Sequence, residues 1–203
     1  PPRNITLIQP SGTLSKLADV TEGIHKPLGR YIFNNMTFSE HDPLLEKLAA
    51  AGYHSIRHPT QQDAVVVTFP VSWEGIDFTN VGGGRFINTD SAIQQLELYK
   101  LFMLNYVDQN ASITVSYSPN EIGGIISWLH ANWDSYVGVS FLPRLDATKK
   151  AADLGYPFLP QEVVDKEEYF KYASSLKEVD FGNTNGTSTL LDDDCPSGVC
   201  PVR

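Results

Sequence analysis

Two cysteines, Cys195 and Cys200, lie near the end of the 203-residue chain and could carry thiol chemistry. Pro196 and Gly198 stand between them and favour a turn, so the two thiols can close a small disulfide ring. Paired thiols on an exposed arm suit thiol–disulfide exchange, which needs access and reach into a second site. A zinc half-site is a poorer interpretation because two further ligands are absent nearby. An inert surface disulfide is the third reading, although so short a ring would gain little stability.

A second stretch, residues 4–19, could bind phosphate. Residues 4–8 predict a short buried strand from Ile5, Leu7 and Ile8, and Pro10 ends it. Residues 11–13 form a small-residue turn, and the following apolar residues recur at helical spacing. A turn that opens a helix presents unpaired N–H groups and the positive end of the helix dipole. The spacing is not that of a Walker loop, and a plain turn is the alternative interpretation.

The composition of the chain limits the functions that these two stretches can have. A formal net charge of −9 argues against an open nucleic-acid surface, and no apolar run is long enough to span a bilayer. No signal peptide precedes the first strand, and a start at Pro1 suggests a piece of a longer polypeptide. Two late cysteines favour a reducing, cytoplasmic compartment. No second ligand lies at metal spacing from His25, so no metal site is expected.

The elements that must position these stretches follow from hydrophobic periodicity and capping residues. Strands are expected at residues 31–38, 65–70, 111–117 and 137–142, and helices after Pro43, after Thr89 or Asp90, after Ser118 and after Asp165. In the helix after Ser118, we expect buried side chains at Ile122, Ile125, Ile126 and Leu129. Residues 82–84, three glycines, read as a hairpin tip. The alternation of strands and helices predicts an α/β fold with strands meeting in one sheet or barrel.

The composition changes at residue 181. Residues 182–189 are small and polar, and residues 192–194 are three aspartates. Such a segment cannot bury enough apolar surface to order itself. We therefore divide the chain into a folded part, residues 1–180, and a flexible tail, residues 181–203, that carries the cysteine pair.

Five motifs in series resemble the C-terminal part of a ribonucleotide reductase large chain. They are residues 9–15 (Gln-Pro-Ser-Gly-Thr-Leu-Ser), 23–27 (Gly-Ile-His-Lys-Pro), 112–118 (Ser-Ile-Thr-Val-Ser-Tyr-Ser), 133–141 (Trp-Asp-Ser-Tyr-Val-Gly-Val-Ser-Phe) and the terminal Cys-x-x-x-x-Cys. The chain is most similar to the adenosylcobalamin-dependent (class II) ribonucleoside-triphosphate reductases. Class I enzymes relay a radical through an adjacent Tyr-Tyr pair on a late strand, and residues 137–141 contain no such pair.

The resemblance implies the last strands of a ten-stranded α/β barrel. It implies that Ser11, Gly12, Thr13, Leu14 and Ser15 bind the substrate's phosphates. It also implies that Cys195 and Cys200 re-reduce the active-site disulfide and are themselves reduced by thioredoxin or a similar dithiol. The substrate would be a ribonucleoside triphosphate, the cofactor adenosylcobalamin, and the partner the remainder of the reductase chain, with neither nucleic acid nor membrane involved.

The resemblance also implies that this chain is inactive alone. In the family the radical-forming cysteine, the active-site dithiol and the effector site lie upstream, and no cysteine precedes Cys195 here. A stand-alone nucleotide-binding module with a redox-switch tail, and a class I reductase fragment, remain the alternatives.

Overall fold

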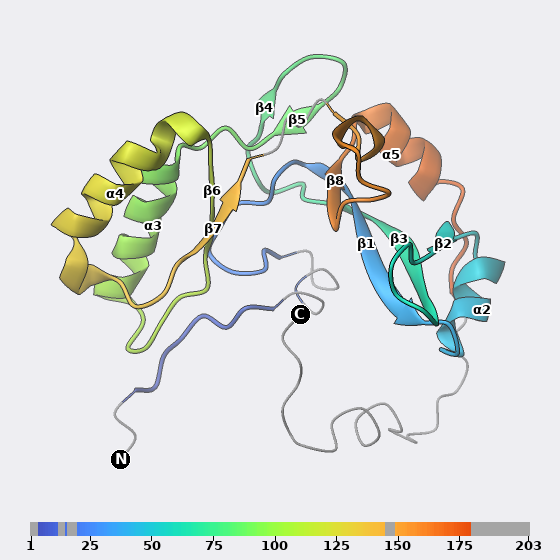
Figure 1. Ribbon diagram of the computed structural model, residues 1–203, viewed down its shortest axis with the longest axis horizontal. Helices are drawn as coiled ribbons and strands as arrows, with labels where there is room; N and C mark the ends of the chain where they lie inside the picture. Colours follow the sequence, from blue (N-terminus) through green and yellow to red (C-terminus); the bar gives the residue numbers. More distant parts are fainter. Residues whose placement is uncertain (1–3, 12–14, 16–19, 145–148, 180–203) are drawn as a thin grey trace.

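The computed structural model describes residues 4–11, 15, 20–144 and 149–179, and its elements fall into two halves (Figure 1). In chain order the strands and helices are β1 (Tyr31–Ser39), α2 (Leu44–Ala50), β2 (Ser55–Arg57), β3 (Ala64–Ser72), β4 (Thr79–Asn80), β5 (Phe86–Ile87), α3 (Ala92–Asn105), β6 (Thr114–Tyr117), α4 (Ile122–Ala131), β7 (Ser140–Pro143), β8 (Gln161–Val163) and α5 (Lys166–Ala173). Short 3-10 turns cover Pro119–Glu121, Trp133–Ser135 and Ala152–Leu154.

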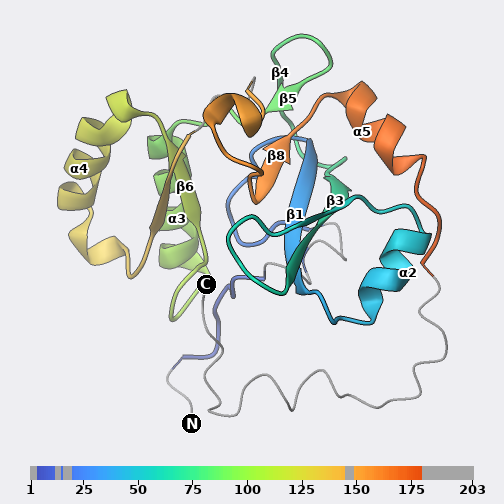
Figure 2. The same cartoon turned by 45° about the vertical axis from the view of Figure 1, so that its right-hand side comes forward.

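One half is a four-stranded sheet in the order β2-β3-β1-β8, with every pairing antiparallel. The helices α2 and α5 lie on the side of this half that faces away from α3 and α4 (Figure 2). Ile32, Val66 and Val67 are almost completely buried. Val66 and Val67 are consecutive in β3 and point to opposite faces, so both faces of the sheet are covered there. Helix α5 packs aromatic rings on β1, and the ring centroids of Tyr31 and Tyr169 are 4.9 Å apart.

Strand β3 continues through Pro70, which the sequence placed at its end. Pro70 lies opposite Phe33 of β1, and β2 pairs only with residues 65–67 of β3. The side of β3 away from β1 therefore has no strand partner at Pro70. The missing N–H costs no ladder hydrogen bond there, which is how a sheet accommodates proline.

The other half holds the parallel strands β6 and β7, with α3 and α4 packed against them (Figure 1). Ile8 makes a parallel bridge to Ala111, so the segment before the predicted phosphate turn runs in the same direction as the chain entering β6. Leu96 and Tyr99 of α3 are fully buried, and the Tyr99 hydroxyl donates to Asn110 Oδ1 at 2.7 Å. Parallel neighbours end on the same side, so this half brings together the carboxyl ends of its strands.

The observed mixture of helices and strands agrees with the predicted α/β class, and the expected helices and hairpin tip are present. The described strands form three sheets, so the single sheet that the sequence predicted is not present among the described residues. The reason lies in the connections. Strands β1 and β3 pair directly, and the intervening helix α2 has only 7 residues. No described helix is long and apolar enough to cross a membrane.

The cap of α3 is Ser91, and not Thr89 or Asp90. The Ser91 hydroxyl accepts from the Gln94 N–H at 3.2 Å, and Gln94 Oε1 accepts from the Ser91 N–H at 2.8 Å. This reciprocal capping box satisfies two backbone donors at once. The Asp90 carboxylate instead lies 3.4 Å from the Lys26 ammonium, so it is engaged elsewhere.

Four side chains expected in the core are exposed. Ile5 and Leu7 are 76% and 52% exposed. The segment at residues 4–8 pairs with the chain on one side, where the backbone of Thr6 and Ile8 bonds to residues 108–112. Ile122 and Ile126 of α4 are also exposed, whereas Trp128 is buried. Trp128 donates its indole N–H to Glu97 Oε1 at 2.6 Å, which turns that face of α4 toward α3.

Candidate functional site

The predicted phosphate turn is closed at both ends by hydrogen bonds. Ser15 is buried, and its hydroxyl donates to the carbonyl oxygen of Ser11. The Val20 N–H donates to the Ser15 carbonyl at 3.0 Å, and the Ser11 N–H donates to the Glu22 carbonyl at 3.0 Å. Because the Ser11 N–H is already used, any backbone donors for a phosphate must come from later in the turn. Gly12, Thr13, Leu14, Cys195 and Cys200 lie outside the described residues.

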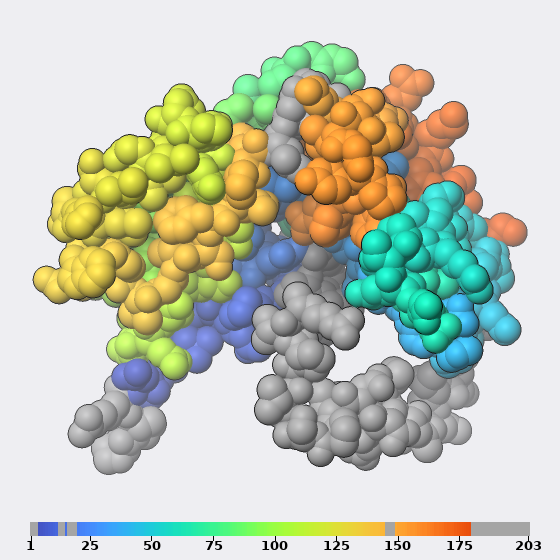
Figure 3. Space-filling model, in the orientation of Figure 1, coloured from blue at the N-terminus to red at the C-terminus, as the bar shows by residue number. Residues whose placement is uncertain are grey.

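Two adjoining cavities open where the carboxyl ends of β6 and β7 face the antiparallel half. Their volumes are about 550 and 360 Å³, within the range of small-molecule sites. In the space-filling view a small hollow lies between the residues around β7 and those around β8 (Figure 3). Both cavities are lined by Leu28, Ser116, Leu142, Leu159 and Gln161. Ligands of α/β proteins bind at this end of parallel strands.

Basic side chains line both cavities, with Lys26 in the smaller one and two such groups in the larger one. Arg144, Lys149, Asn88 and Ser118 line it. Burial of the nearby Glu121 carboxyl would raise its pKa, but hydrogen bonds from the Ala92 and Ser118 N–H groups outweigh this. Together with the charge of Arg144, they hold the pKa of Glu121 below its ordinary value.

The smaller cavity carries two ring nitrogens without partners. His25 and Trp73 line it, and within the described residues neither His25 Nδ1 nor Trp73 Nε1 has a hydrogen-bond partner, although both atoms are buried. Trp73 as a whole is only 3% exposed. A buried polar atom left unpaired costs about 1–3 kcal/mol. Unpaired atoms beside a cavity indicate a place for polar groups of a ligand.

The turn is tied to these cavities through Glu22. Gln161 of β8 donates its amide to Glu22 Oε1 at 2.9 Å, and Glu22 and Gln161 both line the smaller cavity. The carbonyl of Glu22 accepts from Ser11 at the start of the turn. The predicted phosphate turn and the cavities therefore belong to one connected region.

Gly23 allows this region to approach β6. A Cβ atom at Gly23 would lie 2.3 Å from the carbonyl oxygen of Ser112. Directly after it, the Ile24 N–H donates to that same oxygen at 2.9 Å. The glycine in the Gly-Ile-His-Lys-Pro motif is thus required for contact between two backbones.

Burial of the His25 imidazole lowers its pKa, and the Glu22 carboxylate opposes this effect. The unfolded chain binds a proton near pH 6.5 that the folded chain does not. The free energy of unfolding should therefore fall as the pH drops through 6.5, by at most about 1.4 kcal/mol per pH unit. Urea denaturation between pH 7.5 and 5.5 measures this slope, which should be shallower in His25→Gln. His41→Gln, on an exposed turn, is the control. Equal slopes in wild type and His25→Gln would contradict the prediction.

Sequence reasoning missed Trp73, Arg144 and Gln161. Arg144 lies two residues after the predicted strand at 137–142, and a polar residue near the carboxyl end of a parallel strand is a signal that could have found it. Trp73 and Gln161 reach the cavity through antiparallel pairing, which no local pattern revealed. Within the described part of the chain, no three His, Cys, Asp or Glu residues are grouped to hold a metal ion.

No protein-family model matches the chain. An adenosylcobalamin-dependent ribonucleoside-triphosphate reductase from Lactobacillus helveticus is 29% identical over 206 residues, covering 98% of this chain and 26% of the relative. The reductase of the same name from Lactobacillus leichmannii is 28% identical over 205 residues, covering 98% and 26%. The chain thus spans about a quarter of the length of the relatives that it matches.

A solved structure agrees with these relatives. The crystal structure of a B12-dependent (class II) ribonucleotide reductase aligns with a TM-score of 0.67 and 28% identity, covering 85% of this chain and 23% of that one. The resemblance to class II reductases indicated by the motifs is therefore confirmed in sequence and in fold.

Proposed function

Because the chain resembles class II ribonucleotide reductases over nearly its whole length, we propose that it is part of such an enzyme. The whole enzyme would convert ribonucleoside triphosphates to 2′-deoxyribonucleotides by thiyl-radical chemistry in a reducing, cytoplasmic compartment. The observation that carries the proposal is the match across 98% of the chain to adenosylcobalamin-dependent reductases. The chain would form the C-terminal part of the reductase barrel, up to residue 180.

In this proposal the turn at residues 11–15 binds the substrate's phosphates. The support is local: the turn follows a segment parallel to the entry of β6, and its ends are held by the Ser15–Ser11 and Ser11–Glu22 hydrogen bonds. Holding the turn before the ligand arrives reduces the entropy lost on binding. Backbone N–H groups beyond Ser11 and the hydroxyls of Ser11 and Thr13 would supply the donors, while the Ser15 hydroxyl would hold the turn through the Ser11 carbonyl.

Cys195 and Cys200 would form the thiol relay of the enzyme. A dithiol near the end of the chain can reduce a disulfide left in the active site, becoming a disulfide itself in the exchange. Thioredoxin or a similar dithiol would then return the pair to the reduced form. The active-site thiols would come from the remainder of the reductase.

The described residues fit parts of adenosylcobalamin, which carries carboxamide side chains and a phosphodiester around its corrin. The unpaired nitrogens of His25 and Trp73 fit carboxamides, and the guanidinium of Arg144 fits a phosphate oxygen. The cavities suffice for such parts and not for the whole molecule. When bound, the cofactor supplies a radical by homolysis of its cobalt–carbon bond. The residues of this chain would bind and orient the carboxamides and the phosphodiester at the edge of the cofactor.

The proposal is tested by assaying the natural full-length protein for ribonucleotide reduction with thioredoxin, with and without adenosylcobalamin. We expect deoxyribonucleotide formation that depends on the cofactor. Activity that instead requires an iron-containing partner would place the protein in class I. Absence of reduction under both conditions, together with nucleotide binding that changes with the redox state of the tail, would support the stand-alone binding module.

A further inference from the structure

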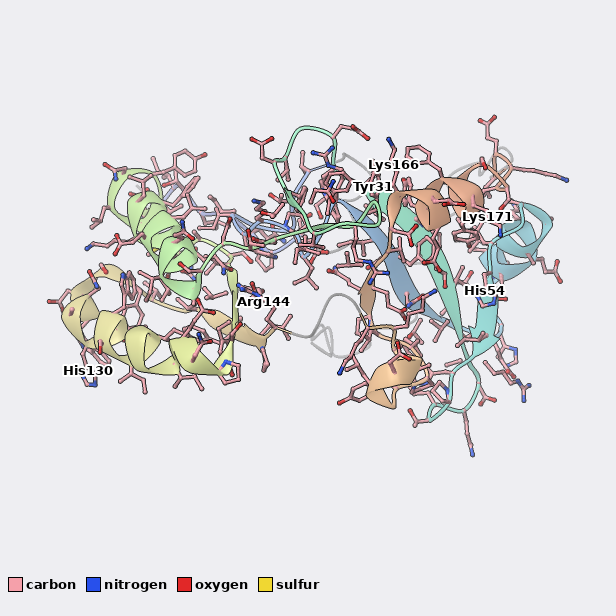
Figure 4. The ribbon with its side chains drawn as sticks, turned by 90° about the horizontal axis from the view of Figure 1, so that it is seen from above. Tyr31, His54, His130, Arg144, Lys166 and Lys171 are labelled. Atoms are coloured by element: carbon pink, nitrogen blue, oxygen red, sulfur yellow. The ribbon has the colours of Figure 1, made fainter. Side chains whose placement is uncertain are left out.

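Arg144 lies directly after β7, at the carboxyl end of the parallel pair. The backbone N–H of Arg144 donates to the Tyr117 carbonyl at 2.7 Å, which continues the pairing of β7 with β6 by one residue. Seen from above, Arg144 stands between the half that contains α3 and α4 and the half that contains Tyr31 (Figure 4). It lines the larger cavity, so its side chain is at the place where a ligand would meet both halves.

The guanidinium is anchored by one nitrogen. Arg144 Nη2 donates to the Asp90 carbonyl at 2.7 Å, to the Ser116 carbonyl at 3.2 Å and to the Ser116 hydroxyl at 3.3 Å. Ser116 is itself fixed, because Gln95 accepts from the Ser116 N–H at 3.0 Å and donates to its carbonyl at 2.9 Å. Both Ser116 and Gln95 are about 95% buried. The orientation of the arginine is therefore set by a rigid part of the core.

The other two nitrogens of the guanidinium are not anchored by the core. Among the described residues, no hydrogen bond involves Arg144 Nη1 or Nε, and the side chain is only partly buried. The nearby carboxylate of Glu121 is already hydrogen-bonded to the N–H groups of Ala92 and Ser118. An arginine that only joined the chain before α3 to β6 would not need to line a cavity with Nη1 and Nε still free to donate. A planar fork of N–H donors is suited to phosphate.

We infer that Arg144 is an anion anchor, separate from the turn at residues 11–15, that binds a phosphate oxygen of the ligand held between the two halves. Two ligands of the proposed reductase carry this chemistry: the polyphosphate of the nucleotide and the phosphodiester of the cobalamin. The inference rests on the proposed function only for the identity of these two ligands. The neighbouring Lys149 adds positive charge to the same cavity.

The test uses the natural full-length protein and two matched pairs of ligands. One pair is a ribonucleoside triphosphate and its nucleoside, and the other is cobalamin and cobinamide, which lacks the phosphodiester. Calorimetry with wild type and Arg144→Gln should show about a 10- to 100-fold loss of affinity for one phosphate-bearing ligand, the effect of losing a charged hydrogen bond. Affinity for its phosphate-free counterpart should change less than about twofold. The pair that responds identifies the source of the phosphate.

Arg30→Gln is the matched control. Arg30 also donates Nη2 to a backbone carbonyl, that of Ile76 at 3.1 Å, but it lines neither of the two cavities. Its replacement should leave the discrimination between paired ligands unchanged. If Arg144→Gln fails to fold, Arg144→Lys keeps the charge without the fork and should retain part of the discrimination.

Equal losses for both members of each pair, or no loss for any ligand, would overturn the inference. A protein that reduces no ribonucleotide, yet loses affinity for a phosphate-bearing ligand in Arg144→Gln, would retain the anion anchor and refute the proposed function. The two failures are therefore distinguishable.

Discussion

Replacing Cys195 or Cys200 with serine in the natural full-length protein should leave the first turnover intact and stop repeated turnover with thioredoxin. In the proposed reductase, the first turnover would use only the thiols already reduced in the active site. Later turnovers would need the disulfide formed there to be reduced by exchange with a second dithiol, and a single remaining thiol cannot complete such an exchange. Rapid-quench measurement of product in the first cycle, followed by steady-state rates, separates the two phases.

A small dithiol reductant provides the control for this experiment. Such a molecule can reach the active site without the tail, so it should restore repeated turnover to both serine variants. Ser197→Ala, which changes a residue between the cysteines but no thiol, should behave as wild type with thioredoxin. Wild-type steady-state rates in either cysteine variant with thioredoxin would remove the relay role.

Gly23→Ala should destabilise the protein by about 1–3 kcal/mol, the usual cost of forcing atoms into a packed region. The new methyl group would lie 2.3 Å from the Ser112 carbonyl oxygen, a distance that requires one backbone to move. Moving it also breaks the 2.9 Å hydrogen bond from the Ile24 N–H to the same oxygen. Urea denaturation of wild type and variant, compared at the midpoint, measures the loss.

The matched control is Gly75→Ala. A Cβ atom at Gly75 would have no heavy atom within 4 Å, and this glycine has no positive φ angle. Its replacement should change the free energy of unfolding by less than about 0.5 kcal/mol. If Gly23→Ala were as mild as Gly75→Ala, the close approach of residues 23 and 112 would not be a constraint in solution.

Local patterns predicted the elements whose causes are local. The Ser118–Glu121 capping box and the Asp165 cap are both formed, with Asp165 Oδ1 accepting from the Glu168 N–H at 2.8 Å. Strand β1, predicted at residues 31–38, spans Tyr31–Ser39. In these cases the information lies within a few residues of the element, which is why the sequence was sufficient.

Features that depend on distant partners were not predictable in the same way. The sequence marked Ile5 and Leu7 as buried because they are apolar, yet a strand is covered only where a neighbour lies beside it. Trp73 and His25 line the same cavity only because the end of β3 and the loop that contains His25 meet there. Arg144 acquires its orientation from Asp90 and Ser116, which are far from it in the chain.

The late pairing of β8 with β1 has a consequence for synthesis on the ribosome. β1 and β3 both lie in the first part of the chain and can pair early. The other edge of β1 is paired only after Val163, the partner of Ile32, has been synthesised. Until residues 161–163 emerge, that edge of β1 offers unpaired backbone groups to any passing strand, which is a known route to aggregation. A shortened chain that ends before β8 would keep this edge open permanently. Expression of any truncated form should therefore retain the sequence through α5, whose Tyr169 closes over Tyr31.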